Sequence, residues 1–197
     1  LCIFVLSQDF KNELIRRGIK SDIHLTSTKV PDYFISGFDL SMRQGKAENI
    51  MYSGRIEKAK GVYETVDTFS ILKSQYKDLT LTFVGDGSEL PMLKQYVENK
   101  KIKDVRFTGE LRGEDFKKEY INADMYLFLS YTEGMPTVVL EAMIFGLPIF
   151  TRKVGGLIDF FENGKMGYIS SSLDPAVFAE AMKPYIENPA KMRSVSI

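Results

Sequence analysis

The stretch that decides the fold is DMYLFLSYTEGMPTVVLEAMIFG, residues 124–146. Residues 124–130 form an apolar run that is typical of a central strand in a parallel sheet, where both faces are buried. After a polar turn, the segment from Pro136 is apolar on almost all sides, and this pattern predicts a buried helix. A strand, a turn and a buried helix in this order predict one unit of an α/β fold.

Similar units lie on both sides of this stretch. Runs rich in β-branched and aromatic residues alternate with segments that carry apolar residues at helical spacing. The expected strands are 49–54, 79–85, 104–109 and 147–151, and the expected helices are 62–76, 90–97, 116–121 and 175–185. We therefore predict a Rossmann-like α/β fold, a parallel sheet with helices on both faces. In such sheets, ligands bind beyond the carboxyl ends of the strands.

Composition argues against several other classes. The 197 residues include 26 basic and 26 acidic ones, so no net field attracts nucleic acid. Cys2 is the only cysteine, so no internal disulfide can form, and with a single histidine we expect no structural zinc site. No apolar run approaches the roughly 20 residues of a membrane span, and the first ten residues do not form a signal peptide. Because the chain starts without methionine, we expect a piece of a longer protein.

Glu141 is the charged residue within the apolar helix expected after Pro136. Its neighbours three and four positions away include no cation, so it has no partner within the helix. A buried, isolated charge costs several kcal/mol or shifts its pKa. Three interpretations stay open: an ion pair with another helix, a carboxylate tip that reaches solvent, or a carboxylate held for a ligand hydroxyl.

The turn before this helix favours the third interpretation. Gly134 allows a ligand to approach the backbone closely, and Pro136 suits the first helical position. The amides of Thr137 and Val138 would then be free N–H groups at a helix start, which is an anion site. Glu133 lies just outside this site.

A second candidate anion site is the segment SGRIEKAKG, 53–61, with Arg55, Lys58 and Lys60 before a helix that starts near Gly61. Cations at a helix N-terminus are unfavourable by a few tenths to about 1 kcal/mol each, and a bound anion would remove that cost. A solvated basic loop is the alternative. The segment VGDGSEL, 84–90, is weak support for a phosphate loop, because Leu90 stands where a dinucleotide fingerprint needs a third glycine.

Five segments together resemble the C-terminal, nucleotide-sugar-binding domain of retaining GT-B glycosyltransferases of the family-4 type. The resemblance runs from about residue 49 to residue 187, and the segments include the Glu133 and Glu141 pair, spaced as E-x7-E. In order, they are SGRIEKAKG, FVGDGSEL, VRFTGEL, LFLSYTEGMPTVVLEAMIFGLPIFTRKVGGL and ENGKMGYI. Two departures are the text STKVPD, where the family often has an Asn-Gly-x-Asp turn, and Asp159, where a glutamate is common.

The resemblance implies roles for individual residues. Arg55 and Lys60 match the basic pair that neutralises the diphosphate of the donor. Glu141 matches the carboxylate that accepts hydrogen bonds from the ribose, and Glu133 matches the one that faces the transferred sugar. The remaining donor-binding positions are Gly54, Gly85, Leu111 (a backbone contact to the base), Gly134, Met135, Pro136, Thr137 and Val138.

The resemblance also implies an organisation and an activity. Residues 1–45 would be a remnant of the N-terminal domain with the interdomain linker, and 46–197 the donor-binding domain. The full-length enzyme would transfer a hexosyl-type sugar from a nucleoside diphosphate to an acceptor hydroxyl with retention, without metal or cofactor. The acceptor, a sugar or lipid-linked saccharide, would bind the N-terminal domain, so the fragment alone would be inactive. We expect a role in polysaccharide biosynthesis in the cytoplasm, with peripheral contact at the inner face of the membrane.

Three alternatives remain open from the sequence. A nucleotide-sugar epimerase has the same architecture, but it would call for more acids and histidines. A non-catalytic nucleotide-binding module would not need Arg55, Lys60, Glu133 and Glu141 together. A flavodoxin-like or receiver domain would need an acidic cluster near the start of the chain.

Overall fold

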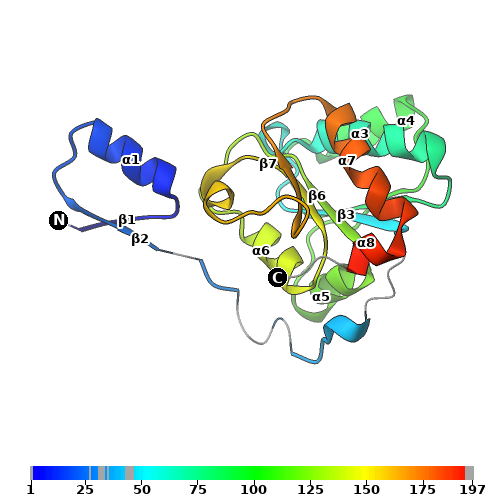
Figure 1. Cartoon of the computed structure of the whole chain (residues 1–197). Helices are drawn as coiled ribbons and strands as arrows, with labels where there is room; N and C mark the ends of the chain where they lie inside the picture. The colour runs from blue at the N-terminus through cyan, green and yellow to red at the C-terminus, as the bar shows by residue number, and fades with distance from the viewer. Residues whose placement is uncertain (1, 27, 31–33, 35, 43–46, 194–197) are drawn as a thin grey trace.

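The computed structural model of the chain describes residues 2–26, 28–30, 34, 36–42 and 47–193. Its main body is built on a six-stranded sheet in which every neighbouring pair is parallel (Figure 1). Strands β4, β3, β6 and β7 lie inside the sheet and are almost wholly buried, as the apolar runs predicted. The strands are β3 (Asn49–Ser53), β4 (Thr80–Val84), β5 (Val105–Phe107), β6 (Met125–Phe128), β7 (Ile149–Arg152) and β8 (Gly167–Ser170).

The strand order of this sheet is β5-β4-β3-β6-β7-β8. Counted from β3 as the first strand, this is the order 3-2-1-4-5-6 of a doubly wound Rossmann-like fold, and not the flavodoxin-like order. The predicted fold class is therefore confirmed. The order reverses between β3 and β6, and ligands of such sheets bind at this point, beyond the carboxyl ends of the strands.

Helices cover both faces of the sheet. Figure 1 shows α3, α4 and α7 on one side and α5 and α6 on the other. Each helix turns apolar residues toward the sheet. Helix α7 begins at Pro175 as predicted, and the Asp174 carboxylate caps it by accepting a hydrogen bond from the Ala176 N–H at 2.9 Å. The helices of the body are α3 (Val62–Gln75), α4 (Leu90–Asn99), α5 (Gly113–Asn122), α6 (Thr137–Ile144), α7 (Pro175–Glu187) and α8 (Pro189–Arg193).

Several boundaries differ from the sequence predictions. Strand β7 begins at Ile149, two residues later than expected. Strand β8 was not predicted, because a strand of four residues that begins with a glycine gives a weak periodic signal. A 3-10 helix, η2 (Lys58–Lys60), precedes α3. Pro136 is the N-cap of α6 and not its first helical residue: its φ of −74° suits a helix, but its ψ of 100° is extended.

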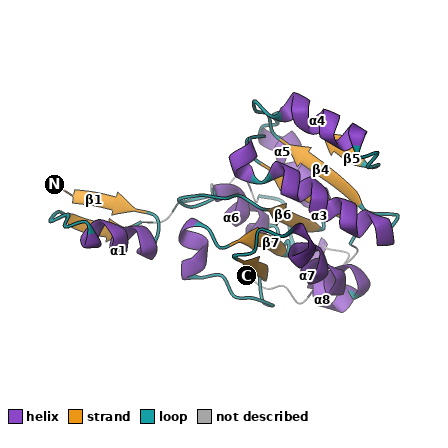
Figure 2. Ribbon diagram, turned by 90° about the horizontal axis from the view of Figure 1, so that it is seen from above, coloured by secondary structure: helices purple, strands orange, loops and turns teal. Residues whose placement is uncertain are grey.

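The N-terminal segment forms a separate small unit (Figure 2). Strands β1 (Cys2–Val5) and β2 (Asp22–Leu25) pair in parallel, and α1 (Gln8–Arg16) connects them. A strand, a helix and a strand thus follow one another in this segment. That residues 1–45 are the remnant of another domain remains a prediction, and its boundary, between residues 45 and 46, lies outside the described residues.

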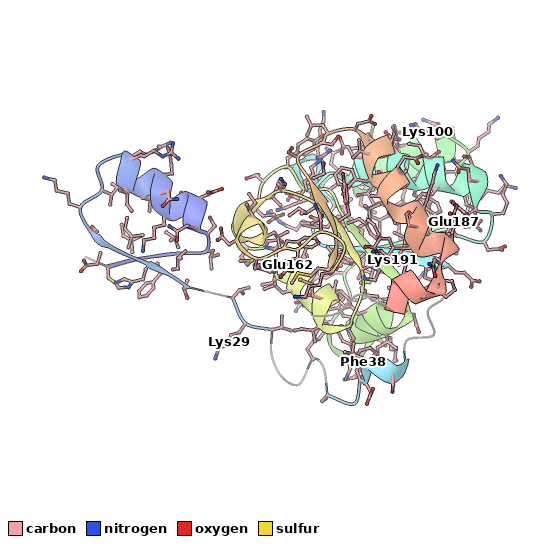
Figure 3. The ribbon with its side chains drawn as sticks, viewed as in Figure 1. Lys29, Phe38, Lys100, Glu162, Glu187 and Lys191 are labelled. Carbon is pink, nitrogen blue, oxygen red and sulfur yellow. The ribbon has the colours of Figure 1, made fainter. Side chains whose placement is uncertain are left out.

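Two groups of contacts join this unit and its connector to the body. The Gln8 N–H at the start of α1 donates to Asp159 Oδ2 at 2.9 Å, and Asp159 ends the 3-10 helix η3 (Gly155–Asp159). In the connector, which contains the 3-10 helix η1 (Leu40–Met42), Phe38 lies against the body (Figure 3). Its ring centroid is 4.9 Å from that of Phe145, just after α6.

Candidate functional site

Two adjoining cavities lie beyond the carboxyl ends of β3 and β6, at the point where the strand order reverses. One, of about 270 Å³, is lined by Gly54, Arg55, Lys60, Phe128, Glu133, Met135, Pro136, Thr137 and Val138. The other, of about 340 Å³, is lined by Gly54, Arg55, Val84, Gly85, Asp86, Glu110, Leu111, Phe116 and Val138. Because they share three residues, they form one continuous site. It contains ten of the twelve predicted site residues; Gly134 and Glu141 line neither cavity.

The loops after β3 and β6 are bound to each other by backbone contacts. The Tyr131 N–H donates to the Ala59 carbonyl at 3.0 Å, and the Ser130 hydroxyl donates to the same oxygen at 3.3 Å. Gly61 lies so close that a Cβ there would be 1.9 Å from the Leu129 carbonyl oxygen, and its φ of 68° is left-handed. These contacts explain how residues so distant in the sequence reach one cavity.

Both cations of the first cavity have carboxylate partners. Lys60 Nζ lies 2.7 Å from Glu133 Oε1, and the two side chains are only 15% and 13% exposed. The Arg55 guanidinium lies 2.9 Å from Glu57 Oε1, but its side chain is 69% exposed. The expected cost of cations before α3 is thus partly offset by neighbouring carboxylates, a compensation that the sequence argument had assigned to a bound anion.

The N-terminus of α6 faces the first cavity with two free amides. The Val139 N–H donates to the Pro136 carbonyl at 3.0 Å. Among the described residues, no acceptor is found for the N–H groups of Thr137 and Val138, which are the first two of the helix. Free amides at the positive end of a helix dipole attract an anion. The two amides on which the anion prediction rests are therefore at the helix start, although Pro136 stands one position earlier than expected; the binding of an anion there stays a prediction.

Glu141 has a tyrosine as its partner and not a cation. It is half-buried, and its Oε2 accepts a hydrogen bond from the Tyr120 hydroxyl at 2.8 Å. Burial raises the pKa of the Glu141 carboxyl, and the Tyr120 hydrogen bond opposes this. No ion pair to Glu141 exists within the described part of the chain, so the interhelix ion pair considered above does not form there.

The second cavity has both apolar and acidic lining residues. Val84, Phe116 and Val138 supply apolar surface, and Asp86 and Glu110 supply carboxylates. Leu111 also lines this cavity, and its backbone contact to the base stays a prediction. Gly85 lines it too, and a Cβ there would be 1.9 Å from the Gly54 carbonyl oxygen, so this glycine is also needed for two loops to pack.

Sequence reasoning missed the residues that support the site from behind. Ser53, Tyr120 and Tyr126 are fully buried and hydrogen-bonded to one another. Arg152 is also buried, and its guanidinium lies 4.3 Å above the Tyr131 ring. The sequence signal for the two tyrosines was ambiguous, because a tyrosine within an apolar pattern is typical of an ordinary core residue.

A larger cavity, of about 510 Å³, lies at the opposite edge of the sheet, beside the amino ends of β3 and β4. It is lined by Ala47, Glu48, Gln75, Tyr76, Lys77, Asp78, Leu79, Ile186 and Pro189. The candidate site is therefore identified by its chemistry and its place in the topology, not by its size. In the part of the chain that the structure describes, three His, Cys, Asp or Glu side chains nowhere gather as metal ligands would. None of the described helices is long and apolar enough to cross a membrane.

Solved structures of glycosyltransferases share this fold. Staphylococcus aureus TarM, in a structure that contains UDP, superposes with a TM-score of 0.81 at 16% identity, over 97% of this chain and 38% of that one. Anabaena HepE, solved with UDP and glucose, superposes with a TM-score of 0.79 at 19% identity, over 98% of this chain and 55% of that one. The sheet and its helices thus match the Rossmann-like half of GT-B glycosyltransferases.

Sequence comparison leads to the same group of proteins. The chain is 30% identical over 149 residues to the glycogen synthase of Mycobacterium tuberculosis, which is 75% of this chain and 36% of that protein. It spans about a third of the length of the curated relatives it matches. Residues 41–196 match the family described as Glycosyl transferases group 1. The chain therefore belongs to the group 1 glycosyl transferase family.

Proposed function

We propose that this chain binds the nucleoside diphosphate sugar donor of a glycosyltransferase. The observation that carries the proposal is the convergence of Lys60, Arg55 and the free amides of α6 on one cavity. Cations and a helix N-terminus provide positive charge for a diphosphate. The adjoining cavity, lined by apolar side chains and two carboxylates, has the character of a site for the base.

In the reaction of the full-length protein, a sugar would pass to an acceptor hydroxyl with retention of its anomeric configuration. Negative charge develops on the departing diphosphate, and Arg55, Lys60 and the α6 amides would stabilise it. This arrangement does the work that a metal ion does in other enzymes, and we therefore propose catalysis without metal. Glu133 lies at the same cavity and would hold the hydroxyls of the transferred sugar.

The acceptor would bind a part of the protein outside the donor-binding body. We infer this because all the groups named above would serve the donor, and they lie beyond the carboxyl ends of the strands. The N-terminal unit lies next to that edge through the contact of Gln8 with Asp159. We therefore expect the chain alone to bind donor and to turn it over poorly or not at all.

Calorimetry tests the donor site directly. The chain is titrated with UDP, GDP and ADP, each with and without Mg²⁺. Glu141→Ala serves as the site variant, and Glu162→Ala, which removes an exposed acid paired with Lys165, serves as the control. We expect metal-independent binding of one nucleotide, lost in Glu141→Ala and kept in the control. Absence of binding to all three nucleotides would overturn the proposal for this chain.

A second experiment addresses the stereochemistry. The full-length protein is supplied with the donor whose nucleotide the chain binds, and the anomeric configuration of the product is read by NMR. Retention is the expected result, and inversion would contradict it. Release of an isomerised sugar nucleotide without transfer would instead favour the epimerase alternative.

A further inference from the structure

A buried network of hydroxyl groups connects the end of β3 to Glu141. Ser53 Oγ lies 2.8 Å from the Tyr120 hydroxyl and 2.8 Å from the Tyr126 hydroxyl. The Tyr120 hydroxyl in turn lies 2.8 Å from Glu141 Oε2. Ser53, Tyr120 and Tyr126 are all 0% exposed, so water cannot replace any of these bonds without opening the core.

The chemistry of the groups gives this network a direction. An ionised carboxylate only accepts hydrogen bonds, so the Tyr120 hydroxyl donates to Glu141. Its single proton is then used, and the Tyr120 oxygen can only accept from Ser53. The Ser53 hydroxyl is thereby engaged as a donor, and the Tyr126 hydroxyl can donate to Ser53. The protons therefore run from Ser53 through Tyr120 to Glu141, and the Tyr126 hydroxyl lies behind Ser53, 2.8 Å from its Oγ and 3.1 Å from its carbonyl oxygen.

Aromatic packing holds the Tyr120 ring in place. The ring stacks on Phe145 with centroids 5.4 Å apart and meets Phe116 edge-on at 5.1 Å. Phe34 approaches it edge-on at 5.7 Å. Because these contacts leave the ring little freedom, the position of the Tyr120 hydroxyl is set by the core and not by the ligand.

Only one oxygen of Glu141 is occupied by this network. Within the described residues, Oε1 has no hydrogen-bond partner, while Oε2 is held by Tyr120. Phe116, one turn before Tyr120 on α5, lines the cavity proposed for the base. The same helix therefore contributes both a wall of that cavity and the group that orients Glu141.

We propose that Tyr120 is a positioning residue, whose hydroxyl, held by Ser53, turns the Glu141 carboxylate so that its free oxygen accepts the ribose hydroxyls of the donor. This inference rests on the proposed donor site. It adds Tyr120, a residue that would act on the ligand only through Glu141. The Tyr120 hydroxyl also lies 3.3 Å from the Val138 carbonyl, but its 2.8 Å bond to Glu141 is the shorter one, so the proposal predicts a loss that depends on the ribose hydroxyls of the ligand.

The test compares nucleotides with and without ribose hydroxyls. The chain, Tyr120→Phe and Tyr185→Phe are titrated calorimetrically with UDP, GDP and ADP, and with the 2′,3′-dideoxy form of whichever binds. Tyr120→Phe keeps the ring and its packing. Tyr185→Phe is the matched control, because it removes another buried hydroxyl, 3.5 Å from the Gly167 carbonyl and remote from Glu141.

We expect Tyr120→Phe to weaken the binding of the ribonucleotide about five- to tenfold, the effect of losing one ordinary hydrogen bond. Its affinity for the dideoxynucleotide should stay within about twofold of the parent value, and Tyr185→Phe should change neither. Equal losses for both nucleotides, or no loss for either, would overturn the inference and leave the donor site standing. Failure of the parent chain to bind any nucleotide would instead overturn the proposed function, and this inference with it.

Discussion

Lys60 and Glu133 form an ion pair of 2.7 Å between two loops that lie 73 positions apart in the sequence. The pair bridges the ends of β3 and β6, where the strand order reverses, and both side chains are mostly buried. A diphosphate that approaches Lys60 therefore competes with a carboxylate already in contact with it. Likewise, a sugar that approaches Glu133 meets a carboxylate that already has a partner.

Glu133→Gln should tighten the binding of a nucleoside diphosphate that carries no sugar. The substitution removes the competing carboxylate and its repulsion of the phosphates, so we expect an affinity gain of about two- to fivefold. Calorimetry with UDP, GDP and ADP measures it. Glu162→Gln, which neutralises the exposed acid labelled in Figure 3, is the control and should have no effect. Weaker binding in Glu133→Gln would show that Glu133 contacts the nucleotide favourably.

Lys60→Met should harm both stability and binding, and a double variant separates the two effects. Alone, it leaves Glu133 unpaired in a mostly buried place, which should cost about 1–3 kcal/mol of unfolding free energy. Lys60→Met with Glu133→Gln should regain most of that stability but not the nucleotide affinity. Denaturant unfolding and calorimetry measure the two quantities. Recovery of affinity in the double variant would mean that Lys60 does not contact the diphosphate.

The sequence was sufficient to predict the fold because its strands are buried on both faces. In a parallel sheet, each interior strand is a short apolar run, and those of β4 and β6 are bounded by clear turn residues. Strand β8 lacked such a signal, because it is short and begins at Gly167. Topology added what periodicity cannot give: the strand order that places the ends of β3 and β6 side by side.

The site was only partly predictable, for a similar reason. Glu141 stood out as a charge in an apolar helix, and its environment is now explained by Tyr120, 21 positions earlier on α5. Nothing in the local sequence distinguishes a core tyrosine that packs from one that also donates to a carboxylate. The pairing of Lys60 with Glu133 was likewise hidden, since it depends on the approach of two loops and not on spacing along the chain.

Glu141→Gln should stabilise the fold in a pH-dependent way. Burial raises the pKa of Glu141, so this carboxyl contributes stability that is fully present below its unfolded pKa and is lost as pH rises through its folded pKa. Tyr120 and Tyr126 do not titrate in that range, since their pKa values are also raised. At pH 7.5 the variant should be the more stable protein, and the difference should vanish near pH 3.5. Unfolding curves at both pH values test this, and a gap that is constant with pH would contradict it.

Arg152→Met should destabilise the loop that carries the site. The Arg152 guanidinium donates to the carbonyls of Leu129, Ser172 and Leu173, at 2.8, 3.1 and 3.3 Å. Their loss leaves the buried Leu129 carbonyl and two partly exposed carbonyls without this donor, and we expect about 2–4 kcal/mol less unfolding free energy. Arg152→Lys should keep only part of this unfolding free energy, because an ammonium group lacks the planar set of donors that a guanidinium has. Full restoration by lysine in denaturant unfolding would show that charge alone matters there.

Gly61→Ala tests whether the loops after β3 and β6 are as close as the structure places them. Gly61 has a φ of 68°, and a Cβ there would lie 1.9 Å from the Leu129 carbonyl oxygen. Gly109 is the matched control, because its φ is 75° but nothing lies within 4 Å of an added Cβ. Gly109→Ala should cost only the backbone strain, about 1–2 kcal/mol.

Gly61→Ala should cost at least about 2 kcal/mol more than the control, since the two backbones have to move apart. That movement also separates Lys60 from Glu133, so nucleotide affinity should fall in Gly61→Ala while Gly109→Ala keeps it. Denaturant unfolding and calorimetry on both variants measure the pair of effects. If the two variants lose the same unfolding free energy, the loops are not in tight contact at Gly61, and the ion pair of Lys60 with Glu133 does not depend on their packing.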